Sequence, residues 1–187
     1  MQVKNAGRTK RTIAVLAIIC GVLQLALVPQ IGLGNGRANM ALVFAGCVAL
    51  TYGHKDGVWC GFFAGLFFDL ATTGPVGLMA FLLTACSYIL GIQGANVLVS
   101  DLRGSIVRFS VAAIAVTLLY HIAMLLTGAA SSLIEVIVFR SLGTIVLTVV
   151  AFLIFAHFLV RVSPSTGLGT PQAAGRHSRS GRGVGRR

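Results

Sequence analysis

Apolar stretches alternate along most of this chain with short breaks that contain Gly, Pro, Asn or charged residues. In order, the apolar runs cover residues 13–29, 39–52, 58–72, 76–93, 105–127 and 134–160. The breaks include a Gly/Asn loop at 31–37, a tight polar turn at 53–57, the pair Gly74-Pro75, a more polar stretch at 93–103 and a small-residue turn at 128–132. Because a helix needs about 20 apolar residues to cross a bilayer, this pattern predicts an all-α membrane protein of about six transmembrane helices.

The second and third runs are shorter than the others, at roughly 15 residues each against the 20 or so that a span needs. Such short helices can cross with little tilt, thin the bilayer locally or pack inside the bundle. They can also form one re-entrant hairpin. We favour two separate spans, and neither choice changes the side of the membrane on which the later loops lie.

Composition supports a membrane protein. Of the 187 residues, 56% are hydrophobic and 10% are charged, whereas globular proteins carry roughly 25% charged residues. We therefore expect three parts: a basic N-terminus at 1–12, a transmembrane domain at 13–160, and a tail at 161–187. The tail is rich in Gly, Ser and Arg and holds too few apolar residues to fold alone, so it is predicted to be disordered.

The net charge of +11 comes almost entirely from the two ends of the chain. Four basic residues precede the first apolar run and six follow the last one, starting at Arg161. With both ends in the cytoplasm, Lys55 and Arg103 also fall on the cytoplasmic side and only Arg37 lies in an outer loop. We expect these charges to meet anionic lipid headgroups rather than nucleic acid. The first run lacks a signal-peptide cleavage site and is predicted to stay as a helix.

Asp69 is one of two charged residues that stand out within the apolar runs. Gly57, Gly61, Gly65 and Asp69 are spaced four apart, so they share one face of the third helix. Glycines at this spacing let a second helix approach closely. We interpret this glycine face as a packing or partner face that also holds Asp69; the alternative is that Asp69 is merely hydrated near the membrane surface.

Arg140 is the second such residue, in the sixth run. Its helical face continues with small and polar residues, namely Thr144, Thr148 and Ala151. Asp69 and Arg140 are predicted to lie at similar depth in the outer half of the bilayer. We hypothesise an intramembrane Asp69–Arg140 pair, because buried charges are usually paired. Glu135, roughly one helical turn from Arg140, is the competing partner.

Catalytic patterns are not evident in the sequence. The four acidic residues are spread over four regions, and the four cysteines, all within apolar runs, match no metal or redox spacing. We interpret the cysteines as reduced and buried, and His121 as a hydrogen-bonded bundle histidine. Three polar residues are read as interhelical hydrogen-bonders: Gln24, Thr84 and Ser87. We therefore assign no catalytic, cofactor or metal residues and expect binding or scaffolding rather than catalysis.

The segment 61–78, with the sequence GFFAGLFFDLATTGPVGL, resembles the rod shape-determining protein MreD family. That family shows a G-x-x-x-G-L-x-x-D-x-x-x-x-G-P-x-G-L segment between its third and fourth helices, after a first helix that ends in a Pro-containing loop, here Val28 to Leu33. The residues that match are Gly61, Gly65, Leu66, Asp69, Gly74, Pro75, Gly77 and Leu78. The order and number of helices over residues 12 to about 160 also agree.

The resemblance implies a non-catalytic subunit of the bacterial cell-elongation machinery in the cytoplasmic membrane. Expected partners are MreC, with MreB, RodA and its penicillin-binding transpeptidase in the wider complex. On this view, partners contact the glycine face or the family-motif turn Gly74-Pro75-Val76-Gly77. No cofactor is expected.

The family's fold is similar to the substrate-binding subunits of energy-coupling-factor vitamin transporters, which supplies the main alternative function. A vitamin site needs an outward-facing pocket with aromatic and polar groups. The one tryptophan, Trp59, lies at the predicted cytoplasmic end, and the outer loops are poor in aromatic residues. A third class, a small membrane enzyme such as a lipid-headgroup transferase, lacks its acidic motif.

Overall fold

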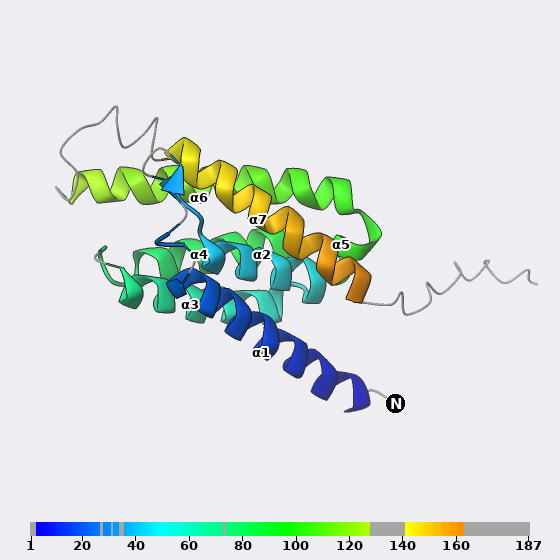
Figure 1. The fold of residues 1–187 in the computed structure, drawn as a ribbon. Helices are drawn as coiled ribbons and strands as arrows, with labels where there is room; N and C mark the ends of the chain where they lie inside the picture. The colour runs from blue at the N-terminus through cyan, green and yellow to red at the C-terminus, as the bar shows by residue number, and fades with distance from the viewer. Residues whose placement is uncertain are drawn as a thin grey trace, which may run out of the picture.

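A computed structural model shows a bundle of α-helices and one very short strand pair (Figure 1). It describes residues 3–26, 28–30, 32–33, 36–72, 74–127 and 141–162. The elements in chain order are α1 (Val3–Ala26), β1 (Gly32–Leu33), β2 (Gly36–Arg37), α2 (Met40–Tyr52), α3 (His54–Ala71), α4 (Leu78–Gly91), α5 (Val97–Ser100), α6 (Leu102–Leu126) and α7 (Ser141–Val162). Each of the six predicted apolar runs therefore corresponds to one of the longer helices.

The connections differ from the predictions in three places. The turn expected at 53–57 is a single residue, Gly53, whose φ of 89° reverses the chain so that α3 begins at His54. The loop expected at 31–37 forms the antiparallel pair β1–β2, and the polar stretch at 93–103 contains the short helix α5. Helix α1 begins at Val3, ten residues before the first apolar run.

Helix α2 is the centre of the bundle. Every residue from Ala41 to Thr51 is buried, and α2 contacts every other helix of the described part. Figure 1 shows α6 and α7 on one side of α2, with α1 and α3 on the other. The shortness of the second apolar run follows from this position, because a helix sheltered by its neighbours need not match the thickness of the lipid.

The core closes around two stacked aromatic rings. Phe109 of α6 and Phe152 of α7 are fully buried, with ring centroids 3.8 Å apart and planes 7° from parallel. Gly46 of α2 lies under the Phe109 ring, where a Cβ atom would be 2.6 Å from the ring carbons. Gly46 thus allows α6 to pack against the central helix. Four thiols are free; Cys20, Cys47 and Cys86 are buried and Cys60 is partly exposed.

Three helices of the described part are long and apolar enough to cross a membrane: Thr9–Ala26, Leu102–Leu126 and Ser141–Arg161. Helices α2 and α4 are apolar but shorter. Large apolar side chains are exposed on the outer faces of the bundle, among them Ile18, Leu70, Phe81 and Val111. A surface of this kind suits lipid rather than water.

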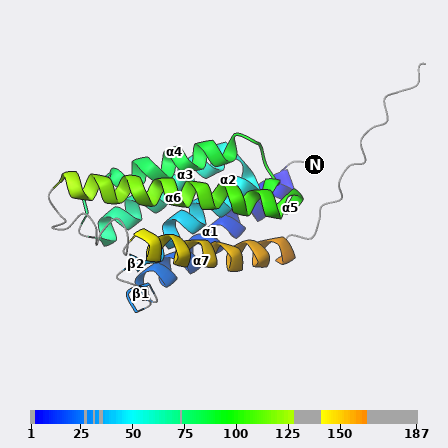
Figure 2. The same ribbon diagram turned by 90° about the horizontal axis from the view of Figure 1, so that it is seen from above.

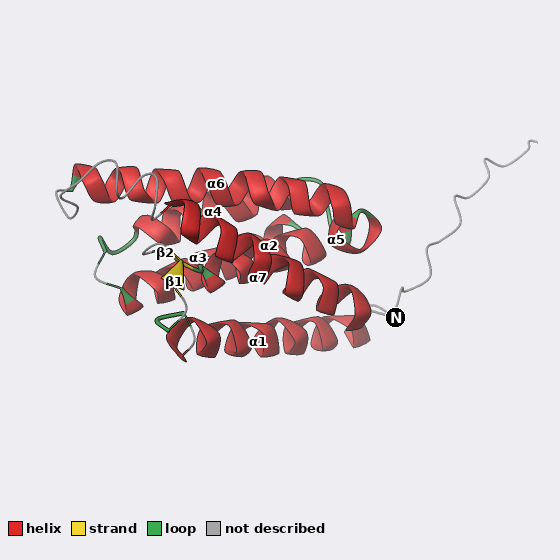
Figure 3. Cartoon of the chain, turned by 45° about the horizontal axis from the view of Figure 1, so that its top comes forward, coloured by secondary structure: helices red, strands yellow, loops and turns green. Residues whose placement is uncertain are grey.

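The chain's connections gather at two opposite ends of the bundle. The start of α1, the segment around α5 and the end of α7 lie at one end, whereas β1–β2 lies at the other (Figures 2 and 3). Hydrogen bonds agree with these views: the Asn96 amide donates to the Thr51 carbonyl at 2.8 Å at the first end, and the Arg37 amide donates to Thr144 Oγ1 at 3.2 Å at the second. We name them the α5 end and the hairpin end.

Truncating Phe152 tests the aromatic stack. Phe152→Ala removes a fully buried ring and is expected to lower the free energy of unfolding by about 3–5 kcal/mol. Phe158→Ala on the same helix is the matched control, since Phe158 is 60% exposed. The readout is the melting temperature of the detergent-purified protein; equal losses in the two variants would contradict this account of the core.

Candidate functional site

The candidate site is the α3–α4 hairpin, which contains the motif segment 61–78. Gly57, Gly61, Gly65 and Asp69 are all buried on one face of α3, as their spacing predicts. A Cβ atom on Gly61 would lie 2.8 Å from the Leu83 carbonyl oxygen, and one on Gly65 would lie 2.7 Å from that of Met79. Both neighbours belong to α4. The two glycines therefore bring the backbones of α3 and α4 into direct contact.

Gly57 makes the corresponding approach to α2, where a Cβ atom would lie 2.8 Å from the Ala49 Cα. The glycine face is therefore filled by α2 and α4 of the same chain. Of the two uses predicted for Gly57, Gly61 and Gly65, packing and partner binding, the structure shows packing within the chain, since the close approach that small residues permit is made by α2 and α4.

Asp69 holds the start of α4. Its side chain is 1% exposed, and its carboxylate accepts three backbone N–H bonds. Oδ2 accepts from Gly77 at 2.9 Å and Ala80 at 3.1 Å, and Oδ1 accepts from Met79 at 3.1 Å. The first N–H groups of a helix have no partner within the helix, and its N-terminus favours negative charge. Asp69 supplies both needs from the neighbouring helix.

The glycines of the turn have separate roles. Gly77 adopts φ 97°, a left-handed conformation that disfavours other residues. Its N–H can then point back to Asp69. A Cβ atom on Gly74 would collide with the Tyr120 hydroxyl of α6 and lie 3.5 Å from Met124 Sδ. Gly74 thus lies against α6, and Gly77 gives the turn the shape that presents the start of α4 to Asp69.

The predicted Asp69–Arg140 pair cannot be placed, because Arg140 and its competitor Glu135 lie outside the described residues. The structure does give Asp69 a set of partners that sequence reasoning missed, since backbone N–H groups leave no trace in a residue pattern. The alternative of a merely hydrated Asp69 is wrong, because the side chain is buried and triply bonded.

A second helix start, that of α2, is satisfied in the same way at the hairpin end. Asn39 Oδ1 accepts from the Leu42 amide at 3.0 Å, Gln24 Oε1 accepts from the Met40 amide at 2.8 Å, and Thr148 Oγ1 accepts from the Asn39 amide at 3.0 Å. Asn39 Nδ2 also approaches Met79 Sδ at 3.8 Å. We call Gln24, Asn39, Asp69 and Thr148 the capping network. It ties α1, α2, α3, α4 and α7 together.

Other predicted polar residues have mixed outcomes. Gln24 bonds across helices as expected, and His121 Nδ1 lies 2.9 Å from Ser141 Oγ, which joins α6 to α7. Thr84 donates to Ala80 of its own helix, so its interhelical role was wrong. Ser87 packs against Gly61, and its hydroxyl has no hydrogen-bond partner among the described residues. Asn39 was missed, although an Asn directly before an apolar run is a recognised helix-start signal.

The described residues contain no cluster of three or more His, Cys, Asp or Glu side chains that could hold a metal ion. The carboxylate buried at the site, that of Asp69, is committed to backbone groups. The arrangement can therefore hold helices in register, and its polar atoms are directed at the chain itself.

Removing the Asp69 carboxylate should destabilise the start of α4. Asp69→Ala leaves three N–H groups without their acceptor and is expected to cost about 3 kcal/mol or more, since each unsatisfied donor costs about 1–3 kcal/mol. Asp69→Asn keeps one acceptor oxygen, so its stability should lie between that of wild type and that of Asp69→Ala. The double variant Asp69→Arg/Arg140→Asp separates this role from ion pairing, because arginine cannot accept from N–H. Rescue of the melting temperature by the swap would contradict the capping role.

Larger side chains on the glycine face should disrupt the packing of α3 against α4. Gly61→Leu and Gly65→Leu place side chains where the α4 backbone lies, so folded protein in membranes should fall sharply. Ala71→Leu is the control, because Ala71 is exposed on the same helix. The measurement is the amount of monodisperse protein after detergent extraction, and wild-type amounts for both glycine variants would refute the close packing.

Comparison with known proteins identifies no family for this chain: no family model matches it, and neither does any curated protein or solved structure.

Proposed function

We propose that this protein is a non-catalytic scaffold subunit of the bacterial cell-elongation machinery, similar to the MreD family. One observation carries the proposal: the residues shared with the family segment 61–78 form a single structural device. Gly61 and Gly65 let α4 approach, Asp69 anchors its start, and Gly77 turns the chain toward Asp69. The packing of α3 against α4 therefore explains why the motif consists mostly of small residues. Its one charged residue stabilises the fold.

We infer six membrane crossings with both termini in the cytoplasm. The α5 end of the bundle carries the first turn of α3 with Lys55, the start of α6 with Arg103 and Arg108, and the end of α7 with Arg161, on the side where α1 begins (Figure 3). The hairpin end carries Arg37. Basic residues favour the cytoplasmic side, which supports this orientation in the cytoplasmic membrane.

Trp59 supports the same orientation. It lies in the second turn of α3, is 66% exposed and stacks on Phe63 with ring centroids 6.2 Å apart. Tryptophan is enriched where membrane helices leave the hydrocarbon. Its place beside the basic α5 end fits a headgroup position on the cytoplasmic side.

Partner recognition in this proposal uses the outer faces of the bundle rather than the glycine face. Those faces carry exposed apolar side chains on α1, α3, α4, α6 and α7, the surface that a membrane-embedded partner meets. The expected partners are MreC directly, and MreB, RodA and its penicillin-binding transpeptidase in the wider complex. The basic ends face anionic lipid headgroups.

The vitamin-binding alternative is less well supported by the geometry. The apolar groove between α1 and α3 is lined by thirteen apolar, Cys or Gly residues and one polar residue, Gln24. A vitamin site would need several placed polar groups among its apolar walls.

A crosslinked pull-down from native membranes tests the proposal. The tagged full-length protein should co-purify MreC, identified by mass spectrometry, and should show no tight binding of labelled vitamins. Asp69→Ala should lose MreC in proportion to its loss of folded protein. Tight binding of a labelled vitamin, together with absence of MreC from crosslinked material, would overturn the scaffold proposal in favour of the transporter subunit.

A further inference from the structure

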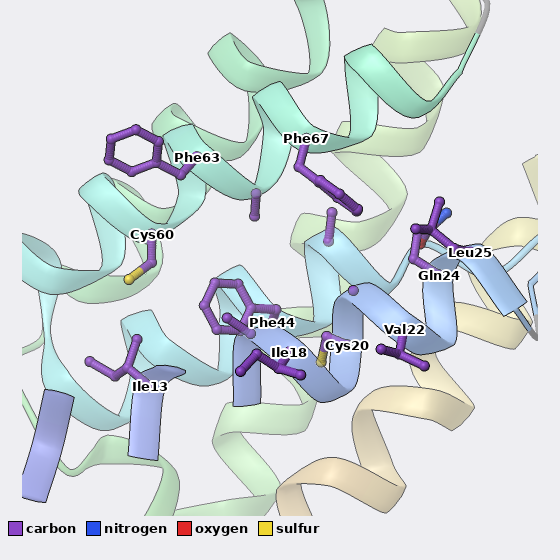
Figure 4. A pocket seen from close by; sticks show the side chains of 14 residues that line it. Ile13, Ile18, Cys20, Val22, Gln24, Leu25, Phe44, Cys60, Phe63 and Phe67 are labelled. Carbon is purple, nitrogen blue, oxygen red and sulfur yellow. The ribbon is translucent and has the colours of Figure 1, made fainter. Parts of the chain in front are cut away.

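An apolar groove of about 560 Å³ lies between α1 and α3, with α2 as its floor (Figure 4). Small residues form much of its two walls: Ala17 and Gly21 on α1, Cys60 and Ala64 on α3. Phe44 of α2 is a floor residue, 6% exposed. A Cβ atom added at Gly21 would meet nothing within 4 Å. The groove is therefore open space beside a helix that is apolar enough to cross a membrane.

The groove runs along α1 from Ile13 to Gln24 (Figure 4). These two residues are eleven positions apart, which corresponds to roughly 17 Å of helix at 1.5 Å per residue. One leaflet of the hydrocarbon core is about 15 Å deep, half of the usual 30 Å. The groove thus has the length of one extended acyl chain of a membrane lipid.

Gln24 lies at the end of the groove nearest β1–β2 and is the polar residue of its lining. Its side chain is nine-tenths buried, and Oε1 is fixed by the Met40 amide at 2.8 Å. The NH₂ group of the same amide has two N–H donors. No acceptor for them occurs among the described residues. An amide NH₂ group that faces an apolar groove without an acceptor is unfavourable, so the occupant of the groove should bring an oxygen to this end.

We propose that the groove binds one acyl chain of a glycerophospholipid from the outer leaflet, with the ester carbonyl accepting a hydrogen bond from Gln24 Nε2. This rests on the membrane orientation proposed above, which puts Gln24 near the outer surface, at the depth of lipid esters. The apolar chain then lies along Ala17 and Gly21 toward Ile13.

A partner's transmembrane helix fits the groove less well. A helix with its side chains is about 10 Å across, so it needs a wider space between α1 and α3 than an acyl chain does. An acyl chain has no side chains and fills a narrow groove.

Lipid retention tests the site. The full-length protein is extracted in mild detergent, and native mass spectrometry counts the glycerophospholipid bound per chain. Wild type should retain one lipid, whereas Ala17→Leu and Gly21→Leu should weaken retention by about tenfold. Ala14→Leu is the matched control: Ala14 is exposed on the same helix, one turn from Ala17, and does not line the groove.

The hydrogen bond is tested separately with two lipids of equal chain length, one ester-linked and one ether-linked. Wild type should prefer the ester lipid, and Gln24→Leu should show no preference, with its melting temperature recorded because Gln24 also holds Met40. Unchanged retention in both groove-filling variants would overturn the proposal, as would loss of MreC with unchanged lipid, which would make the groove a helix site. Lipid retention without MreC would instead refute only the scaffold function.

Discussion

The fold depends on the carboxylate of Asp69 at the start of α4. A helix that begins inside an apolar bundle has N–H groups that neither water nor the helix itself can satisfy. Asp69 satisfies three of them from a neighbouring helix, at 2.9–3.1 Å. The burial of a charged side chain is compensated because these bonds and the helix dipole act on the same group. The carboxylate of Asp69 thus helps to hold α4 against α3.

The same requirement explains the capping network as a whole. Helices α2 and α4 are the two short apolar helices, and both begin within the bundle near the hairpin end. Each start is satisfied by side chains from other helices: Gln24 and Thr148 for α2, Asp69 for α4. The short helix α2 can therefore be accommodated in the interior, whereas α4 keeps an exposed apolar face, as do the long helices α1, α6 and α7.

Glycine serves a different purpose in each part of the motif. On α3 it removes side chains so that two backbones can touch, and in the turn it permits a left-handed residue and leaves room for Tyr120. The small-residue face of α3 is therefore occupied by other helices of the same chain. The function proposed above therefore relies on the outside of the bundle: its apolar faces for partner membrane proteins, and the groove between α1 and α3 for a lipid chain.

The sequence by itself determined the number and order of the longer helices in the part of the chain that the structure describes, because apolar run length and Gly/Pro breaks are local properties. It also placed Asp69 on the glycine face, since helical spacing is fixed by backbone geometry. Only the tertiary structure decided what that face meets. The partners of Asp69 are backbone N–H groups 8–11 residues away, which every sequence contains alike. Likewise, Gln24 and Thr148 meet the start of α2 only because α1 and α7 fold against it. Contacts between helices depend on how the helices pack against one another, and the residue pattern of a single helix does not specify this.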